Sequence, residues 1–370
     1  MSAPHEEARD RAFMRRALSL ARRGWGWTAP NPMVGAVVVR DGRIVGEGFH
    51  ERFGAPHAEA VALAQAGDAA RGATLYVSLE PCAHHGKTPP CADAVIAAGV
   101  TRVVIATRDP HPDAAGGVER MRHTGVRVDV GLLERQAREL NAPFFHAIAT
   151  PSRPWITLKL ALSLDGALAD ATGGARWITG PRARRAAHVL RAGSDAVAVG
   201  IGTALADDPL LTVRGVRRPR RAPLRVVFDR QARLPLGSQL ARSAARHPTA
   251  VITADPPPPQ ATALEREGVT IVAAADLHGA LRALRQMDIR SLLVEGGAAL
   301  ATALLAGAVV DRLIIFHGGT VLGRGAVHPW SALPVDSVDA APRFHILSHR
   351  RMGDDLMTTY APGDAECSPA

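Results

Sequence analysis

The chain has 370 residues, 47% of them hydrophobic, which is enough apolar sequence for two domains that each bury a core. No run of about eighteen apolar residues occurs, and the opening MSAPHEEARDRAF lacks the apolar stretch of a secretion signal, so a membrane or secreted protein is not expected. Only three cysteines occur, too few for a disulfide framework, which indicates a protein of the reducing cytoplasm.

The net charge of +9 is compatible with binding either a nucleic acid or an anionic small molecule. The basic residues are scattered along the chain, and aromatic residues make up only 4%, so platforms for stacking bases are few. We therefore expect a small-molecule substrate that carries phosphate, with no nucleic-acid and no membrane partner.

Helices and strands alternate in the first half of the chain. Apolar residues at helical spacing predict an amphipathic helix over 7–23, and Asp41-Gly42 is a strong hairpin turn. Short strands are predicted at 34–39, 43–48, 74–79 and 102–106. This alternation indicates an α/β/α sandwich with its ligand site where strands lead into helices.

One histidine and two cysteines in this half have the spacing of a catalytic zinc site. Glu59 follows His57 by two residues, and a proline precedes Cys82, as in zinc nucleobase deaminases, although the second cysteine, Cys91, comes later than usual. Imidazole and two thiolates leave a fourth position for water, and Glu59 is close enough to take its proton. We expect His57 and Cys91 each to lie at the start of a helix.

A structural zinc site is the alternative interpretation of the same residues. It would need a fourth ligand, and His84 or His85 could supply one. The glutamate at the catalytic offset and the proline before Cys82 favour a catalytic site.

A second domain is predicted after a proline-containing break at 147–154, because a new strand begins at Trp155. Later, a strand that ends in Glu295-Gly296-Gly297 precedes an Ala/Leu-rich helix whose N-terminus can receive a phosphate, although G-x-G-x-x-G is not matched. The basic segment 217–223 is interpreted as a solvated loop near cofactor phosphates, with a nucleic-acid-binding segment as the alternative. Residues 363–370 are predicted to be a disordered tail.

Motifs in both halves carry a resemblance to one enzyme family. In the first half they are 29–35 (APNPMVG), 57–59 (HAE) and 80–91 (EPCAHHGKTPPC), and in the second 159–166 (KLALSLDG), 177–180 (WITG), 200–214 (GIGTALADDPLLTVR) and 292–297 (LLVEGG). They resemble the bifunctional deaminase–reductases of riboflavin biosynthesis. The resemblance implies a cytidine-deaminase-like α/β/α sandwich over 1–148, followed by a dihydrofolate-reductase-like α/β domain over 154–362.

The family's chemistry is a zinc-dependent deamination of a phosphoribosylated 2,5-diaminopyrimidinone, then reduction of its ribosyl group to ribityl with NADPH. The resemblance implies Zn²⁺ on His57, Cys82 and Cys91, with Glu59 catalytic, and a cytoplasmic homo-oligomer. It implies substrate contacts at Asn31, His84, Lys87, Ala175, Arg191, Leu211, Arg214 and Glu295. It implies cofactor contacts at Ala161, Trp177, Thr203, Asp207, Gly297, Ala298, Ala299, Leu300, Ala301, Thr302 and Ala303.

One residue departs from the family pattern, and three others are assigned from their own chemistry. Position 175 holds alanine where the family often has a hydroxyl residue, which puts one substrate hydrogen bond in doubt. Guanidinium forks match phosphate oxygens, so Arg191 and Arg214 could hold the substrate's phosphate. Asp109 is a weaker candidate for substrate contact.

Two other interpretations remain open from the sequence. One is a nucleic-acid or nucleoside deaminase with an accessory domain, which the positive charge favours. The other is a zinc-stabilised binding protein without catalysis. Metal-dependent release of ammonia from the pyrimidine substrate separates both from the deaminase–reductase.

Overall fold

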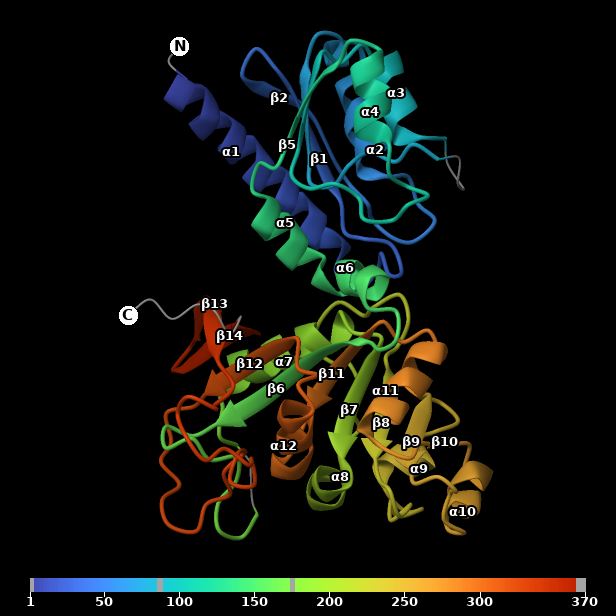
Figure 1. The fold of residues 1–370 in the computed structure, drawn as a ribbon, viewed down its shortest axis with the longest axis vertical. Coiled ribbons are helices and arrows are strands. Elements are labelled where there is room, and N and C mark those ends of the chain that lie inside the picture. Colours follow the sequence, from blue (N-terminus) through green and yellow to red (C-terminus); the bar gives the residue numbers. More distant parts are fainter. Residues whose placement is uncertain (1–2, 85–88, 174–176, 364–370) are drawn as a thin grey trace. The chain divides into compact units, whose positions relative to one another are not determined.

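The computed structural model describes residues 3–84, 89–173 and 177–363, and the chain divides into two compact units, Met1–Ala149 and Thr150–Ala370 (Figure 1). The predicted break at 147–154 spans the junction of these units. The expected tail lies outside the described residues, apart from Gly363. Among the described residues, no helix is long and apolar enough to cross a membrane.

The first unit contains a five-stranded sheet in the order β2-β1-β3-β4-β5. Its strands are β1 (Gly35–Arg40), β2 (Arg43–Phe49), β3 (Thr74–Val77), β4 (Arg102–Ile105) and β5 (Arg127–Val130). β1 is antiparallel to both of its neighbours, and β3, β4 and β5 run parallel. The predicted hairpin is confirmed, with left-handed φ angles of 51° at Asp41 and 74° at Gly42.

Helices cover both faces of this sheet, as predicted (Figure 1). α1 (Ala3–Ala21) and α5 (Glu134–Leu140) lie on one face, and α2 (Ala58–Ala66), α3 (Cys91–Ala97) and α4 (Gly117–His123) on the other; α6 (Ala142–Ala149) follows α5. Alternate residues of β1 enter opposite cores, with Val37 packing in the cluster that contains Met14 of α1 and Val38 in the cluster that contains Ala62 of α2.

The predicted strands at 34–39, 43–48 and 102–106 each differ from the structure by one residue at one or both ends, and two other elements differ by more. The first helix begins at Ala3 and ends at Ala21, followed by a short 3₁₀ turn over 22–24. The third strand ends at Val77 rather than at residue 79, because the Ser78 hydroxyl accepts the Gly35 backbone N–H at 3.1 Å. The chain beyond Ser78 is therefore irregular and leads to the zinc-ligand segment.

The second unit contains a nine-stranded sheet in the order β10-β9-β8-β7-β11-β6-β12-β14-β13. Its strands are β6 (Trp155–Leu162), β7 (Ala196–Gly200), β8 (Leu224–Phe228), β9 (Thr249–Thr253), β10 (Thr270–Ala273), β11 (Ser291–Glu295), β12 (Arg312–His317), β13 (Phe344–Met352) and β14 (Asp355–Pro362). In this sheet order, each strand from β10 through β12 runs parallel to its neighbours. β14 is antiparallel to β12, and β13 is antiparallel to β14 at the edge of the sheet.

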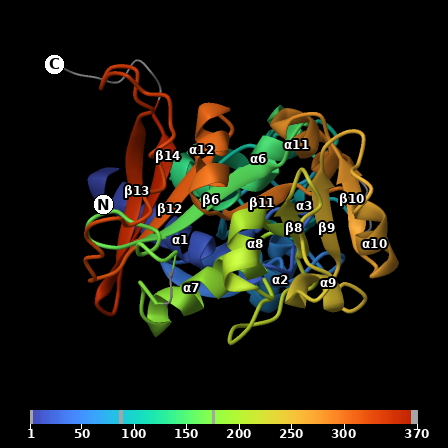
Figure 2. The same ribbon diagram turned by 90° about the horizontal axis from the view of Figure 1, so that it is seen from below.

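Helices cover both faces of this larger sheet as well. They are α7 (Pro181–Ala192), α8 (Ile201–Asp207), α9 (Gln239–Arg242), α10 (Ala261–Arg266), α11 (Leu277–Gln286) and α12 (Ala298–Ala306). Figure 2 shows α11 and α12 on one side of the sheet and α7 and α9 on the other. Leu281 and Leu304 pack in one core and Leu240 and Leu264 in the other. The predicted α/β class is confirmed in both units.

Candidate functional site

The three predicted zinc ligands meet at one end of the first sheet. His57 directly precedes α2 in an extended conformation, Cys82 follows β3, and Cys91 is the first residue of α3. The His57 Nδ1 atom lies 3.2 Å from Cys91 Sγ and 3.7 Å from Cys82 Sγ. All three ligand atoms lie within 4.8 Å of one another, so a single ion can bind all of them.

The donor set fits Zn²⁺ and leaves room for a further ligand. One imidazole nitrogen and two sulfurs are ligands that zinc prefers, and catalytic zinc sites have three protein ligands. Among the described residues, the cluster contains only these three side chains, and His84 is not part of it. His85 lies outside the described residues.

Hydrogen bonds favour the thiolate form of Cys82, whereas the hydrogen bond between the two cysteines, together with burial, raises the pKa of the Cys91 thiol. Its pKa is lowered because its sulfur accepts hydrogen bonds from the Cys91 thiol, the Cys91 backbone N–H and the His57 ring. Thiolates rather than thiols bind metals, so a low pKa favours the ligand form.

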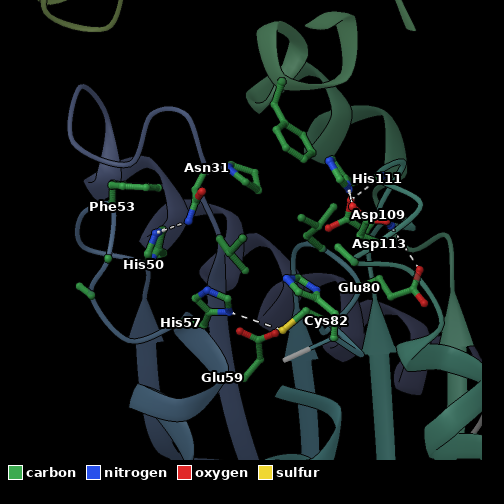
Figure 3. Close-up of a pocket in the computed structure, with 18 residues that line it drawn as sticks. Asn31, His50, Phe53, His57, Glu59, Glu80, Cys82, Asp109, His111 and Asp113 are labelled. Atoms are coloured by element: carbon green, nitrogen blue, oxygen red, sulfur yellow. Dashed lines mark hydrogen bonds and ion pairs between the residues drawn. The ribbon is translucent and has the colours of Figure 1, made fainter. Parts of the chain in front are cut away.

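Glu59 lies in the first turn of α2, beside His57 and Cys82 (Figure 3). Its side chain is buried, with 3% of the residue exposed, and burial raises the pKa of the carboxyl to about 7. A carboxyl with this pKa can both take and return a proton near neutral pH. The two-residue spacing between His57 and Glu59 in the sequence thus places the Glu59 carboxyl beside the predicted zinc ligands.

A pocket of about 380 Å³ opens over these residues (Figure 3). Its walls include Asn31 and His84 from the predicted set, together with Asp109. The lining residues that the sequence did not single out include His50, Phe53, Glu80, His111, Asp113 and Phe144. Lys87 lies outside the described residues, so its predicted contact stays a prediction.

His50 fixes the orientation of Asn31. The His50 Nδ1 lies 3.1 Å from the Pro56 carbonyl oxygen and therefore donates to it, which leaves Nε2 as the acceptor of the neutral ring. Asn31 Nδ2 lies 3.3 Å from that Nε2, so the amide donates to His50 and its oxygen remains available to a ligand. Burial lowers the pKa of His50, which keeps the ring neutral. The sequence offered one signal for His50, which is a polar residue directly after a predicted strand.

Glu80 holds the segment that follows β4 against the cysteine segment. Its buried carboxylate accepts backbone N–H groups from Asp109, Gly116 and Val118 at 3.0–3.2 Å. Gly117 approaches so closely that a Cβ there would lie 1.9 Å from the Pro81 carbonyl oxygen. Glu80 and Gly117 therefore position Cys82 and Asp109, and neither belongs to the three-residue ligand cluster.

In the second unit, three charged side chains meet where β6 and β11 lie side by side. Lys159 and Glu295 are paired across these parallel strands. Arg191, from the last turn of α7, forms a bidentate ion pair with Glu295 and also donates to the Thr212 carbonyl oxygen at 3.0 Å. Burial lowers the pKa of Lys159. Arg191 and Glu295 were predicted from the sequence, but Lys159 was not, although it is the first residue of the recognised motif 159–166.

The predicted cofactor segment begins where β11 leads into α12. Gly297 caps α12, and a Cβ at this position would lie 2.8 Å from the Thr203 hydroxyl of α8. Leu300 and Ala301 pack in the core, and the Thr302 hydroxyl donates to the Pro329 carbonyl oxygen at 3.1 Å. A dinucleotide here would therefore meet the backbone of the first turn of α12, since a helix N-terminus attracts phosphate.

The remaining predicted residues are placed as follows. Trp177 is 68% exposed, and the Arg184 guanidinium lies over its ring, 4.4 Å from the centroid. Ala161 lies on β6, and Asp207 ends α8. Leu211 is buried with a left-handed φ of 51°, and Arg214 is exposed. Ala175 lies outside the described residues.

These features define a zinc-dependent deaminase joined to an α/β reductase. The sequence matches the cytidine and deoxycytidylate deaminase zinc-binding region over residues 7–107 and the RibD C-terminal domain over residues 154–358. The chain belongs to the RibD family, the bifunctional deaminase–reductases of riboflavin biosynthesis. It is accordingly an enzyme with a zinc-dependent deaminase and an NADPH-dependent reductase activity.

Relatives match over nearly their whole length. The riboflavin biosynthesis protein RibD of Aquifex aeolicus is 44% identical over 94% of this chain and 97% of its own, and that of Escherichia coli is 42% identical over 94% and 98%. The Acinetobacter baumannii RibD structure has a TM-score of 0.84 at 39% identity, covering 97% of this chain and all of that one. The Thermotoga maritima diaminohydroxyphosphoribosylaminopyrimidine deaminase/5-amino-6-(5-phosphoribosylamino)uracil reductase has a TM-score of 0.83 at 37% identity, with the same coverage. The family predicted from the motifs is confirmed.

Proposed function

We propose that the first unit deaminates 2,5-diamino-6-(5-phosphoribosylamino)pyrimidin-4(3H)-one and that the second reduces the product to 5-amino-6-(5-phosphoribitylamino)uracil. The observation that carries the first step is the cluster of three ligands with buried Glu59 beneath one pocket. The name of the Thermotoga maritima relative, 37% identical over 97% of this chain, supports both steps.

In the first unit, His57, Cys82 and Cys91 hold zinc. Zinc bound there supplies a Lewis acid that lowers the pKa of water. Glu59 accepts one proton of the attacking water and delivers it to a ring nitrogen of the pyrimidine. It then takes the second proton, from the hydroxyl left on the carbon, and delivers it to the departing amino group, which leaves as ammonia; its raised pKa supports this role. The Asn31 amide oxygen, oriented by His50, accepts a hydrogen bond from the substrate. His84 and Lys87 are assigned to substrate contact from the resemblance.

In the second unit, the reaction needs a hydride and a proton at the substrate's ribosyl group. NADPH supplies the hydride. Glu295, fixed by Arg191, holds the ribosyl hydroxyls, and Lys159 delivers the proton from Nζ. Gly297, Thr203 and Trp177 hold the cofactor, with Ala161, Asp207 and the remaining residues of 298–303 along its length. Leu211, Arg214 and position 175 border the substrate.

We also propose the domain boundaries, the oligomeric state, the cellular location and the kind of partner. The deaminase domain is assigned to 1–148 and the reductase domain to 154–362, in a cytoplasmic homo-oligomer that binds neither nucleic acid nor membrane. The apolar cores confined to each unit support two domains. The low aromatic content supports a small-molecule substrate.

The Glu59→Gln variant tests the proposed roles. Glutamine keeps the shape of the side chain but cannot accept and return a proton, so ammonia release should fall by ~10²–10⁴-fold while zinc stays stoichiometric. Reduction of the deaminated intermediate should continue at the wild-type rate, because the reductase residues lie in the other unit. Near-normal ammonia release from the zinc-loaded variant would contradict the role of Glu59.

A further inference from the structure

Residues 208–216 of the second unit follow α8 and belong to no helix or strand. This segment contains Leu211 and Arg214, which the proposed function places beside the substrate. Leu211 is buried and takes a left-handed φ of 51°. Because no helical or strand ladder pairs the backbone of the segment, its position depends on contacts with the elements around it.

One face of α7 contacts the segment through three side chains that are spaced three residues apart. Residues with this spacing are neighbours on a helix surface. Each of the three is bonded to the backbone of the segment: Arg185 donates to the Gly215 carbonyl oxygen, His188 Nδ1 accepts the Arg214 N–H at 3.3 Å, and Arg191 donates to the Thr212 carbonyl oxygen at 3.0 Å. The helix therefore holds the segment at three points along its length.

Of these three contacts, the one from His188 fixes Arg214 itself. The other two are donated by arginines to carbonyl oxygens, whereas His188 receives a backbone N–H. The backbone of Arg214 is thus held from α7, while the residue as a whole stays exposed. This arrangement fixes the start of the Arg214 side chain and leaves its guanidinium on the surface.

The contact requires a neutral imidazole, because a ring nitrogen that carries a proton cannot accept a hydrogen bond. His188 is partly buried, and burial lowers its pKa. The positive charges of Arg191 and Arg214 lower this pKa further, against the opposing effect of Glu295. The ring is therefore neutral near pH 7, with Nδ1 as the acceptor and the proton on Nε2.

The segment is also held at a point that does not involve α7. Arg225 of β8 is buried and donates to the Leu210 carbonyl oxygen at 3.2 Å. Because this anchor and the two arginines of α7 remain, loss of the His188 contact should release Arg214 locally and leave the rest of the segment in place.

We propose that His188 is a positioning residue of the reductase, whose Nδ1 holds the backbone of Arg214 so that this arginine contacts the phosphorylated substrate in a fixed orientation. The proposal rests on the proposed function, which places Arg214 beside the substrate, and it adds a residue to which that function assigns no role. His188 acts through Arg214 rather than by contacting the substrate. Fixing a binding residue in advance reduces the conformational entropy that is lost when the ligand binds.

Two substitutions separate the acceptor atom of His188 from the packing of its ring. In His188→Leu the side chain cannot accept a hydrogen bond, whereas in His188→Asn the amide Oδ1 can take the place of Nδ1. Arg182→Leu is the matched control, because Arg182 is an exposed residue of the same helix whose side chain lies beside Gly353 instead.

The first measurement is steady-state reduction of the deaminated, ribosylated intermediate with NADPH by the zinc-loaded full-length enzyme. We expect His188→Leu to raise the KM for the intermediate by ~3–10-fold, as the loss of one hydrogen bond does, with kcat and the KM for NADPH within about two-fold. His188→Asn and Arg182→Leu should stay within about two-fold of the wild type in all three constants. Equal impairment by leucine and asparagine, or a KM for NADPH that rises as much as that for the intermediate, would overturn the proposal.

The second measurement is hydrogen exchange of the Arg214 amide, followed by mass spectrometry without substrate. We expect this amide to exchange ~10-fold faster in His188→Leu than in the wild type, because it loses its acceptor, and at the wild-type rate in Arg182→Leu. Unchanged exchange in His188→Leu would show that His188 does not hold Arg214. If the wild type does not reduce the intermediate, the proposed function fails, and the exchange rates still decide whether His188 fixes Arg214.

Discussion

Arg191 and Glu295 form a bidentate ion pair in the second unit, with Nε–Oε1 at 2.5 Å and Nη2–Oε2 at 3.0 Å. Both side chains are mostly buried, at 12% and 13% exposure. Burial alone would raise the pKa of Glu295, but Arg191 outweighs it and holds the pKa at about 2. The carboxylate is therefore fixed in position and charge beside Lys159 of the neighbouring strand.

Arg191→Met should both destabilise the second unit and abolish reduction. Removing one partner leaves Glu295 buried without a counter-charge, which costs about 3–5 kcal/mol in comparable pairs. The Arg191→Met, Glu295→Leu double variant should recover much of that stability but not the reductase activity. Chemical denaturation and NADPH oxidation would separate these effects. A double variant that still oxidises NADPH would show that the Arg191–Glu295 ion pair is only structural.

The sequence identified these two residues through the family motifs, but it could not identify their pairing. They lie 104 residues apart in the sequence and meet only because β11 is inserted between β7 and β6. Lys159 was missed for the same reason, since its chemistry depends on the strand beside it. The zinc ligands were easier to predict, because His57-Ala58-Glu59 and Pro81-Cys82 are local sequence patterns typical of zinc nucleobase deaminases.

Cys91→Ser should lose zinc and weaken the first unit. The serine hydroxyl is a poor zinc ligand, and metal binding is coupled to folding when the ligands come from separate segments. We expect metal analysis to show less than stoichiometric zinc, and heating to melt the first unit at a lower temperature. Reduction of the deaminated intermediate serves as the internal control. Full zinc occupancy would remove Cys91 from the ligand set.

Asn31→Asp should impair deamination while leaving zinc in place. The new carboxylate has no N–H to donate to His50 Nε2, so the side chain loses the hydrogen bond that orients it. An effect of ~10–100-fold on kcat/KM for the pyrimidine is expected, in line with the loss of an oriented substrate contact. His50→Gln is the companion variant and should act in the same direction. Unchanged kinetics in both would mean that Asn31 does not contact substrate.

The pocket of the first unit was only partly predictable. Asn31 and His84 came from the motifs, whereas His50 directly follows β2 and lies outside the recognised motifs, and Phe144 enters from α6, far along the chain. No local spacing in the sequence brings Phe144 to the site. Leu300, Ala301 and Thr302 stay predicted cofactor contacts as part of a continuous run; helical geometry buries their side chains, so such contacts would come from the backbone.

Asp10 of α1 makes the stability of the first unit depend on pH in the acid range. Tyr76 OH donates to Asp10 Oδ1 at 2.5 Å, and Arg102 Nη2 donates to Oδ2 at 2.7 Å, which ties α1 to β3 and β4. Burial would raise the pKa of Asp10, but the hydrogen bonds from Arg102 and Tyr76 outweigh it, so the pKa is lowered. The charged form is therefore the one that stabilises the fold.

Asp10→Asn should destabilise the first unit by about 3 kcal/mol at neutral pH, because the amide weakens charge-assisted hydrogen bonds. A folded-state pKa below the unfolded value, about 3.9, gives stability that is complete above that value and lost as the pH falls through the folded pKa. The difference in unfolding free energy between wild type and variant should thus stay constant from pH 7 to about pH 5 and shrink below about pH 4. Asp129→Asn is the matched control, since Asp129 binds the same Arg102 but is 37% exposed and should matter less. A difference that persists undiminished at pH 3 would show that Asp10 acts through shape and not through charge.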